Sequence, residues 1–229
     1  MKLVRFVSYS ILDVFYPNNC EICQNHLVHT ENFICLTCKF NLPYIDRHKT
    51  MLASIQKIFW GRIEIHQVFS VYNYQKGTHT QKILHAIKYQ NKKRLASHMG
   101  EIMGELLPKN HSFDVLIPVP LHPKKLKQRG YNQSLLLAEG IKKYLDIPIN
   151  NDALKRIKIN QSQTIFSKYD RWDNVKAIFS LNKKDNLEGK HILLVDDVLT
   201  TGATIESCAA AILSEINCKI SVATLAVRV

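Results

Sequence analysis

The sequence lacks any apolar run of the roughly 18 to 20 residues that a helix needs to cross a bilayer. It also lacks internal repeats and low-complexity segments, so no repeat architecture competes with a globular fold. The N-terminus is basic and apolar, but Asp13 interrupts the apolar stretch and no A-x-A-like cleavage site follows. We therefore expect a cytoplasmic protein without a transmembrane span, whose amphipathic first helix packs on the protein or touches a membrane.

Acidic residues are scarce in this chain. It has 19 Asp and Glu residues against 31 Lys and Arg residues, which gives a formal net charge of +12 and a pI near 9.4. This excess favours a polyanionic partner, of which nucleic acid fits best, although a generally basic proteome explains the charge equally well. With 229 residues and 46% hydrophobic content, the chain is long enough for one or two domains with a buried core.

A disulfide framework is disfavoured, because no secretion signal accompanies the six cysteines. Four of them form two CxxC pairs with eleven residues between the pairs, which is typical of a tetrahedral structural zinc site. Two redox pairs are the alternative, but a thioredoxin-like motif would occur once, inside a βαβ unit. His26 and His29 are spare candidates, and Cys208 and Cys218 are expected in the core. The predicted zinc ligands are Cys20, Cys23, Cys35 and Cys38.

Residues 190–216 have the pattern of a buried strand that ends in two acids, followed by a small-residue turn and a helix. The N-terminus of such a helix presents backbone N–H groups at the positive end of its dipole, which suits a phosphate. Asp196 and Asp197 would repel a phosphate, so we expect them to accept hydrogen bonds from sugar hydroxyls attached to it. The alternative is an ordinary strand-to-helix junction with solvated acids. The expected phosphate loop consists of Thr200, Thr201, Gly202, Ala203 and Thr204.

Strands and helices alternate along the rest of the chain, which predicts an α/β fold with a parallel sheet flanked by helices. We expect strands at 68–74, 114–119 and 219–227, and helices at 78–89, at 95–107 and after Asn132. A segment rich in proline and positive charge follows the second strand, and it is typical of a stiff loop that contacts a pyrophosphate or a DNA backbone. Its basic residues, with one lysine of an earlier helix, are Lys88, Lys124, Lys125, Lys127 and Arg129.

Two further segments lack clear periodicity. Residues 42–65 are expected to form a linker, which places a boundary between a zinc module at 1–60 and a main domain at 61–229. Residues 153–181 are mixed and polar, as in a mobile lid or a hood over a ligand site.

The strand, the two acids and the TTG turn resemble the PRPP-binding signature of the type I phosphoribosyltransferases. This resemblance implies that Asp196 and Asp197 bind the ribose hydroxyls and that residues 200–204 hold the 5′-phosphate. The double CxxC, then IPVPLH, RGYNQ, a polar segment at 156–174 and LLVDDVLTTGAT, in this order, resemble the ComF family of competence proteins over essentially the whole chain. The family implies a small N-terminal zinc module with four cysteine ligands on a type I phosphoribosyltransferase-like domain.

The ComF resemblance also implies a role in DNA uptake during natural transformation. Its expected ligands and partners are PRPP with Mg²⁺, incoming single-stranded DNA, and other uptake proteins at the inner membrane. Basic residues at 92–94 lie in the expected DNA path, and the aromatic residues near basic positions are Tyr131, Phe166, Tyr169 and Trp172.

The alternative function is a catalytically active phosphoribosyltransferase of nucleotide salvage or synthesis. The sequence identifies no catalytic residue, so enzyme activity stays open. A PRPP-sensing regulator of transcription would call for a winged-helix module, and none is visible.

Overall fold

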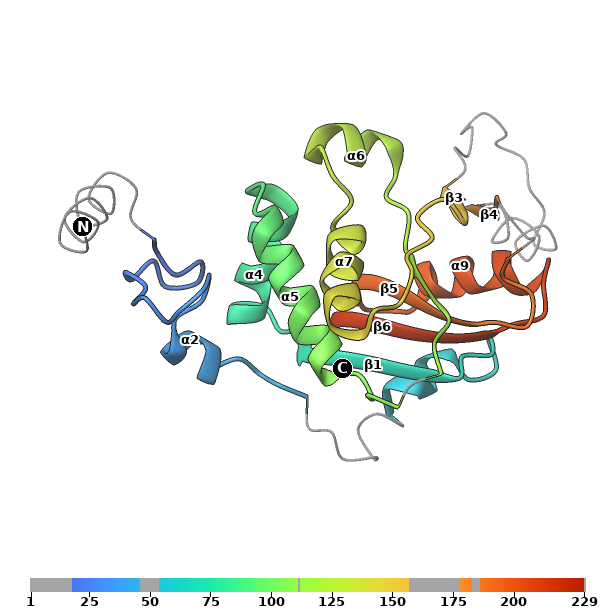
Figure 1. The fold of residues 1–229 in the computed structure, drawn as a ribbon, viewed down its shortest axis with the longest axis horizontal. Helices are drawn as coiled ribbons and strands as arrows, with labels where there is room; N and C mark the ends of the chain where they lie inside the picture. Colours follow the sequence, from blue (N-terminus) through green and yellow to red (C-terminus); the bar gives the residue numbers. More distant parts are fainter. Residues whose placement is uncertain (1–17, 46–53, 111, 157–177, 183–185, 229) are drawn as a thin grey trace, which may run out of the picture.

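The computed structural model describes residues 18–45, 54–110, 112–156, 178–182 and 186–228. Its centre is a four-stranded parallel sheet in the order β1-β6-β5-β2 (Figure 1). The strands are β1 (Gln67–Asn73), β2 (Val115–Pro118), β5 (His191–Leu199) and β6 (Lys219–Val227). The predicted class, a parallel sheet flanked by helices, is confirmed.

Both faces of the sheet are covered, as the continuous apolar runs of its strands require. On one face, α4 (His79–Tyr89), α5 (Lys93–Leu106) and α7 (Gln133–Leu145) form a core cluster with Leu193 of β5. On the other face, α9 (Ala203–Leu213) forms a second cluster with Ile192 and Leu194. Alternate residues of β5 therefore supply the two layers of the core.

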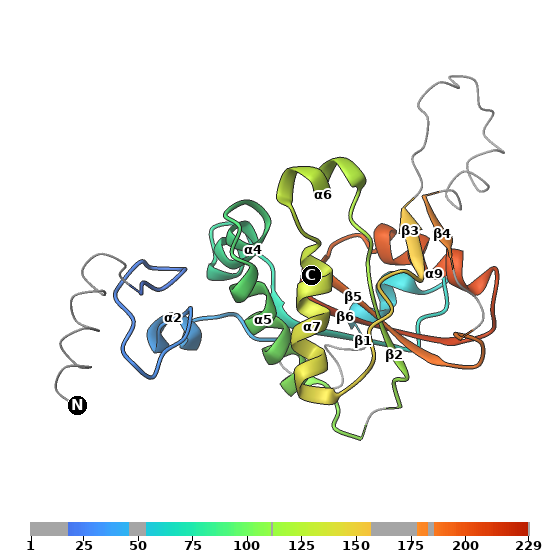
Figure 2. The same ribbon diagram turned by 45° about the horizontal axis from the view of Figure 1, so that its top comes forward.

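The helices α5 and α7 run side by side in both ribbon views (Figures 1 and 2). A glycine of each helix faces the backbone of the other. A Cβ added at Gly100 would overlap the carbonyl oxygen of Leu137, and a Cβ added at Gly140 would overlap that of Ser97. The two backbones are therefore packed too closely for any side chain at either position, and this packing fixes α7 against the sheet.

The N-terminal region from residue 18 to 45 contains the short helix α2 (Leu36–Phe40) and lies beside α4 and α5 (Figure 1). Lys82 Nζ donates to the carbonyl oxygen of Ile22 at 3.2 Å. Lys92 Nζ forms an ion pair with Glu21 Oε1 at 2.8 Å. Two lysines thus connect this region to the helical layer.

The predicted linker is structured where the chain is described. It contains the short 3₁₀ helix η1 (Lys57–Phe59), and Ile55 and Phe59 are buried in the second core cluster. Apolar residues of this segment are therefore part of the core that lies under the sheet. The domain boundary near residue 60 stays a prediction.

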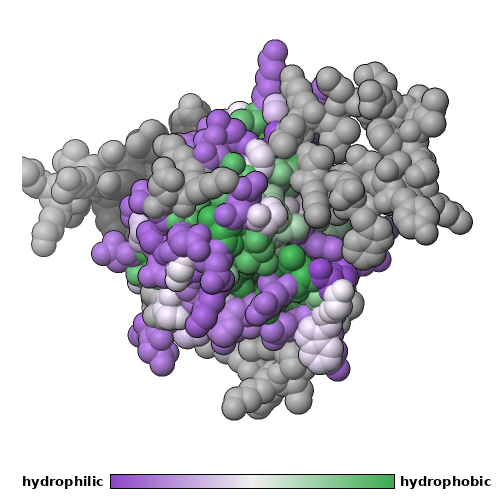
Figure 3. All heavy atoms as spheres, turned by 90° about the vertical axis from the view of Figure 1, so that its right-hand side faces the viewer, coloured by the Kyte–Doolittle hydropathy of each residue, from purple (hydrophilic) through white to green (hydrophobic). Residues whose placement is uncertain are grey.

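The predicted lid begins and ends in a short antiparallel pair, β3 (Leu154–Arg156) with β4 (Phe179–Leu181). The residues between them, 157–177, lie outside the described residues, so the lid itself stays a prediction. Figure 3 views the side on which β3, β4 and α9 lie and shows a hydrophobic area bordered by hydrophilic side chains. Leu181 and Leu213 are partly buried at the edge of the second core cluster.

Two predicted features are wrong. The acids do not end their strand, because β5 continues through both of them to Leu199. The proline-rich segment is not a loop throughout, because α6 (Pro123–Arg129) begins with proline at its first position and ends at Gly130, which has a positive φ of 75°. The predicted strands at 68–74, 114–119 and 219–227 and the predicted helices at 78–89, at 95–107 and after Asn132 are confirmed within one or two residues at each predicted end. The predicted first helix lies outside the described residues. No described helix is long and apolar enough to cross a membrane.

Candidate functional site

The first acid of the predicted site, Asp196, is buried in the middle of the structure. Its Oδ1 accepts a hydrogen bond from Ser134 Oγ of α7 at 2.9 Å and another from the backbone N–H of Asp197 at 2.9 Å. Burial, reinforced by the neighbouring charge of Asp197, raises the pKa of Asp196 to about 7. The carboxyl therefore keeps its proton to a higher pH than usual, and when protonated it can donate a hydrogen bond as well as accept one.

The second acid, Asp197, has one satisfied and one free oxygen. Lys88 Nζ of α4 lies 3.0 Å from Asp197 Oδ1, and the Asp197 side chain is only 5% exposed. Its Oδ2 is buried and has no hydrogen-bond partner in the part of the chain that the structure describes. An unpaired buried carboxylate oxygen costs free energy, so this atom is suited to accept a hydrogen bond from a hydroxyl of a ligand.

The predicted phosphate loop, residues 200–204, shares a small pocket with Asp196. Gly202 has a φ of 79° and lies directly before the N-terminus of α9. Thr200, Thr201 and Thr204 are exposed, and the first backbone N–H groups of a helix such as α9 have no partner within the helix. The structure thus brings the predicted sugar-binding and phosphate-binding residues together at one end of the sheet.

Lys88 lies apart from the other residues of the predicted basic loop, because it pairs with Asp197. The other four belong to α6, on which Lys124, Lys125 and Lys127 are exposed. Arg129 is held by a hydrogen bond to Gln133 Oε1 at 3.0 Å. The three lysines therefore form an exposed basic helix, which projects beyond the other helices in Figure 1.

The predicted stacking surface is wrong at Tyr131, which is buried and donates its hydroxyl to the carbonyl oxygen of Ile87. An exposed aromatic ring lies nearby instead. Tyr89, at the end of α4, is 64% exposed, and the Arg129 guanidinium lies 5.3 Å from the centre of its ring. The other aromatic candidates, at positions 166, 169 and 172, lie outside the described residues.

Each of the predicted basic contacts at 92–94 has a neighbour in the structure. Lys92 pairs with Glu21, the Arg94 guanidinium lies over the ring of Phe33, and Lys93 Nζ lies over the ring of Tyr131. Their contact with a nucleic acid stays a prediction.

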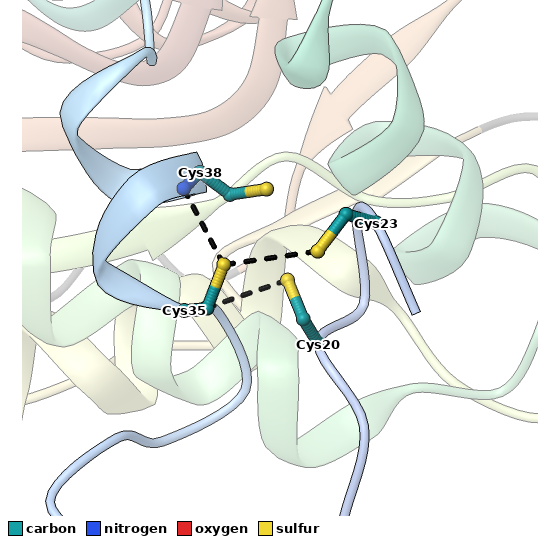
Figure 4. Close-up of side chains that lie close together, drawn as sticks. All are labelled: Cys20, Cys23, Cys35 and Cys38. Carbon is teal, nitrogen blue, oxygen red and sulfur yellow. Dashed lines mark hydrogen bonds between the residues drawn. The ribbon is translucent and has the colours of Figure 1, made fainter. Parts of the chain in front are cut away.

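The four predicted zinc ligands converge (Figure 4). The sulfur atoms of Cys20, Cys23, Cys35 and Cys38 all lie within 4.8 Å of one another. Backbone N–H groups point at the sulfurs, with Cys35 N 3.4 Å from Cys20 Sγ and Cys38 N 3.4 Å from Cys35 Sγ. Such N–H donors stabilise thiolates, and four converging sulfurs at this spacing fit a tetrahedral zinc ion.

The other sulfur and imidazole candidates lie elsewhere. His26 and His29 are exposed and do not belong to the four-cysteine group found among the described residues. Cys208 is fully buried and Cys218 is partly buried, in agreement with the core positions predicted for them.

Comparisons with known proteins agree with this geometry. The sequence profile of the phosphoribosyl transferase domain matches residues 132–228, which include both acids and the phosphate loop. Competence protein F of Haemophilus influenzae is 42% identical over 93 residues, which are 40% of this chain and 41% of that protein. Competence protein ComFC of Bacillus subtilis is 31% identical over 122 residues, which are 52% of this chain and 45% of that protein. The chain is thus similar to two competence proteins over 40% and 52% of its own length.

A longer alignment reaches a protein with a different name. The DNA utilization protein YhgH of Shigella flexneri is 27% identical over 202 residues, which are 83% of this chain and 82% of that protein. The chain spans less than half the length of the two competence proteins that it matches.

Two polar contacts of the site were not predicted from the sequence. Ser134 holds Asp196 from α7, and Lys88 neutralises Asp197 from α4. Both contacts join segments that are far apart in the sequence, and no spacing or motif indicates such a pair. A helix was predicted after Asn132, and Asn132 caps it, because its Oδ1 accepts a hydrogen bond from Ser134 N at 3.1 Å.

Proposed function

We propose that this chain binds PRPP, or a closely related sugar phosphate, and acts in DNA uptake by handling incoming single-stranded DNA in the cytoplasm. The observation that carries the ligand proposal is the pocket that Asp196 shares with the phosphate loop. Asp197 follows Asp196 in β5, and its buried Oδ2 has no hydrogen-bond partner among the described residues. A ribose hydroxyl donates to that oxygen, and a second hydroxyl bonds to Asp196. The 5′-phosphate is held by the hydroxyls and backbone N–H groups of residues 200–204.

The metal ions have separate roles in this proposal. Magnesium accompanies the pyrophosphate of PRPP and needs no dedicated protein cage. Zinc is held by the four cysteines, and it stabilises the small N-terminal region, which has little apolar core of its own. Neither ion is assigned a chemical step.

The single-strand proposal rests on α6 and Tyr89. Three exposed lysines on one short helix supply charge for a phosphate backbone, and Tyr89 supplies an exposed ring on which a base stacks. The names of the relatives support a DNA partner, since YhgH is a DNA utilization protein and two others are competence proteins. Contact with uptake proteins at the inner membrane belongs to the same proposal.

The ligand half is tested by calorimetric titration with PRPP and Mg²⁺. Asp197→Asn removes the charge that faces the ribose, and we expect weaker binding by about 1.5 to 3 kcal/mol. Asp152→Asn, at an exposed position away from the site, is the matched control and should bind as the wild type does. Equal affinity in both variants would exclude Asp197 as a ribose ligand. Pyrophosphate release from PRPP on addition of a nucleobase would identify an active phosphoribosyltransferase.

The DNA half is tested by fluorescence anisotropy with a labelled oligonucleotide at several salt concentrations. Reversing Lys124, Lys125 and Lys127 to Glu should weaken binding. The slope of log affinity against log salt should also become shallower by up to about 2, because each phosphate contact on a single strand contributes about 0.7 to that slope. The control reverses the exposed lysines 76, 109 and 142, which changes the net charge equally at other places. Similar slopes in the two triple variants would show diffuse attraction without a path along α6. Tyr89→Ala should weaken binding without changing the slope.

A further inference from the structure

Arg62 contacts the phosphate loop from outside the ligand pocket. Its Nη1 donates to the carbonyl oxygen of Thr201 at 2.9 Å and to that of Ile58 at 3.1 Å. Its Nη2 pairs with the carboxylate of Glu206, in the first turn of α9. One guanidinium therefore connects three segments: the chain after η1, the phosphate loop and the helix that follows the loop.

The neighbouring residues reinforce this contact. A Cβ added to Gly202 would lie 2.8 Å from Ile58 Cγ2 and 2.9 Å from Phe59 Cε1, so the loop rests directly on η1. Phe59 itself is 1% exposed. The back of the phosphate loop is thus covered by a segment that the sequence indicated only as a linker.

Two of the groups that Arg62 contacts, the Glu206 carboxylate and the Thr201 carbonyl, are unfavourable for anion binding when they are left alone. Glu206 places a negative charge at the end of α9 at which the phosphate is expected, and like charges repel. The carbonyl of Thr201 is an electron-rich atom in the loop whose N–H groups and hydroxyls must face the phosphate. A guanidinium has five donors in a planar fork, so it can hold a carboxylate and a carbonyl at the same time.

The geometry points to Arg62 as a positioning residue for the phosphate loop. It holds the Thr201 carbonyl and the Glu206 carboxylate on its own side of the loop, away from the N–H groups and hydroxyls expected to face the phosphate. It neutralises Glu206 and does not touch the anion. This inference rests on the proposed sugar-phosphate function, because the role of Arg62 is to let the loop accept a phosphate although Glu206 follows it at the start of α9.

The test measures the dissociation constant of ribose 5-phosphate for four proteins: the wild type, Arg62→Ala, Glu206→Gln and the double variant. We expect Arg62→Ala to weaken binding about tenfold, which corresponds to the loss of one charge-assisted contact. Glu206→Gln should bind at least as well as the wild type. In the double variant, Glu206→Gln should restore most of the lost affinity, because the carboxylate that Arg62 neutralised is gone.

Two further measurements separate positioning from general stability. Arg62→Lys keeps a positive charge and should recover part of the affinity, and the thermal midpoint of each variant reports folding directly. Arg94→Ala, which removes an arginine over Phe33, is the matched control and should bind as the wild type does. Equal affinity of the wild type and Arg62→Ala, or tenfold weaker binding that Glu206→Gln does not relieve, would overturn the assignment of Arg62 alone. Absence of ribose 5-phosphate and PRPP binding in the wild type would overturn the proposed function together with this inference.

Discussion

The ion pair between Lys88 and Asp197 can be tested by replacing Lys88 with methionine, which keeps the aliphatic stem and removes the charge. The side chains of Lys88 and Asp197 are 21% and 5% exposed, so the pair lies largely in the interior. Removing one partner of a buried pair costs about 3 to 5 kcal/mol, because the other charge is left without compensation. Because solvent partly reaches Lys88, we expect the variant to lose about 2 to 3 kcal/mol of unfolding free energy, which is at or just below the lower end of that range.

This loss should depend on pH. The positive charge of Lys88 lowers the pKa of Asp196, against the larger effects of burial and of the charge on Asp197 that raise it to about 7. Without Lys88, the pKa of Asp196 rises further. A carboxyl whose pKa is raised in the folded state stabilises that state below its unfolded pKa and loses this contribution as pH rises through the folded pKa. The variant should therefore continue to lose stability to a higher pH than the wild type does.

The assay is urea unfolding followed by circular dichroism at pH 6 and at pH 8.5. The difference in unfolding free energy between Lys88→Met and the wild type should be larger at pH 8.5. Lys142→Met removes the same charge from an exposed position of α7 and should change the unfolding free energy little at either pH. A Lys88→Met protein as stable as the wild type, or a loss of the same size at both pH values, would refute the reasoning.

Three other changes give direct tests. Gly140→Ala should lower the unfolding free energy measured in urea by about 1 to 3 kcal/mol, because the added Cβ would overlap the Ser97 carbonyl. A gain in stability, as Ala gives in an ordinary helix, would contradict this packing. Burial and the charges of His66 and Lys219 lower the pKa of His191, so acidification below about pH 6.5 should destabilise the protein, and His191→Gln should weaken that dependence in thermal scans. Metal analysis should find about one zinc per chain. Cys35→Ser should lose the zinc while its far-UV circular dichroism still reports a folded α/β domain. Zinc retained by Cys35→Ser at the wild-type level would exclude the four-sulfur site.

Much of the sheet was predictable because its strands are buried on both faces. β6 was predicted at 219–227 and is found at Lys219–Val227, because a long apolar run between polar residues defines where the strand begins and ends. β5 was cut short at Asp196 because carboxylates normally mark a solvated strand end. In the folded chain, Ser134 and Lys88 accompany the acids into the interior, and no local pattern records such partners.

The helix α6 is a different kind of error, because its signals are present in the sequence. Pro123 suits the first turn of a helix, and Gly130 suits the left-handed position that ends one. The three prolines between residues 118 and 123 suggested a stiff loop over the whole segment instead. The contacts of Arg62 with Thr201 and Glu206 could not be predicted in the same way, because they depend on how a segment without periodicity packs in three dimensions.

The four-cysteine region and the acid pair are distant in sequence, yet α4 contacts both of them. Lys82 holds the carbonyl of Ile22, which lies between two cysteines of the predicted zinc site, and Lys88 holds Asp197. The two lysines are six positions apart on the helix, or roughly 9 Å along its axis. Because a helix of this length moves as a rigid unit, the position of Lys88 depends on how the N-terminal region holds α4. The apolar face of α4 is buried in the core cluster, so loss of zinc should loosen the ion pair with Asp197 without unfolding the sheet.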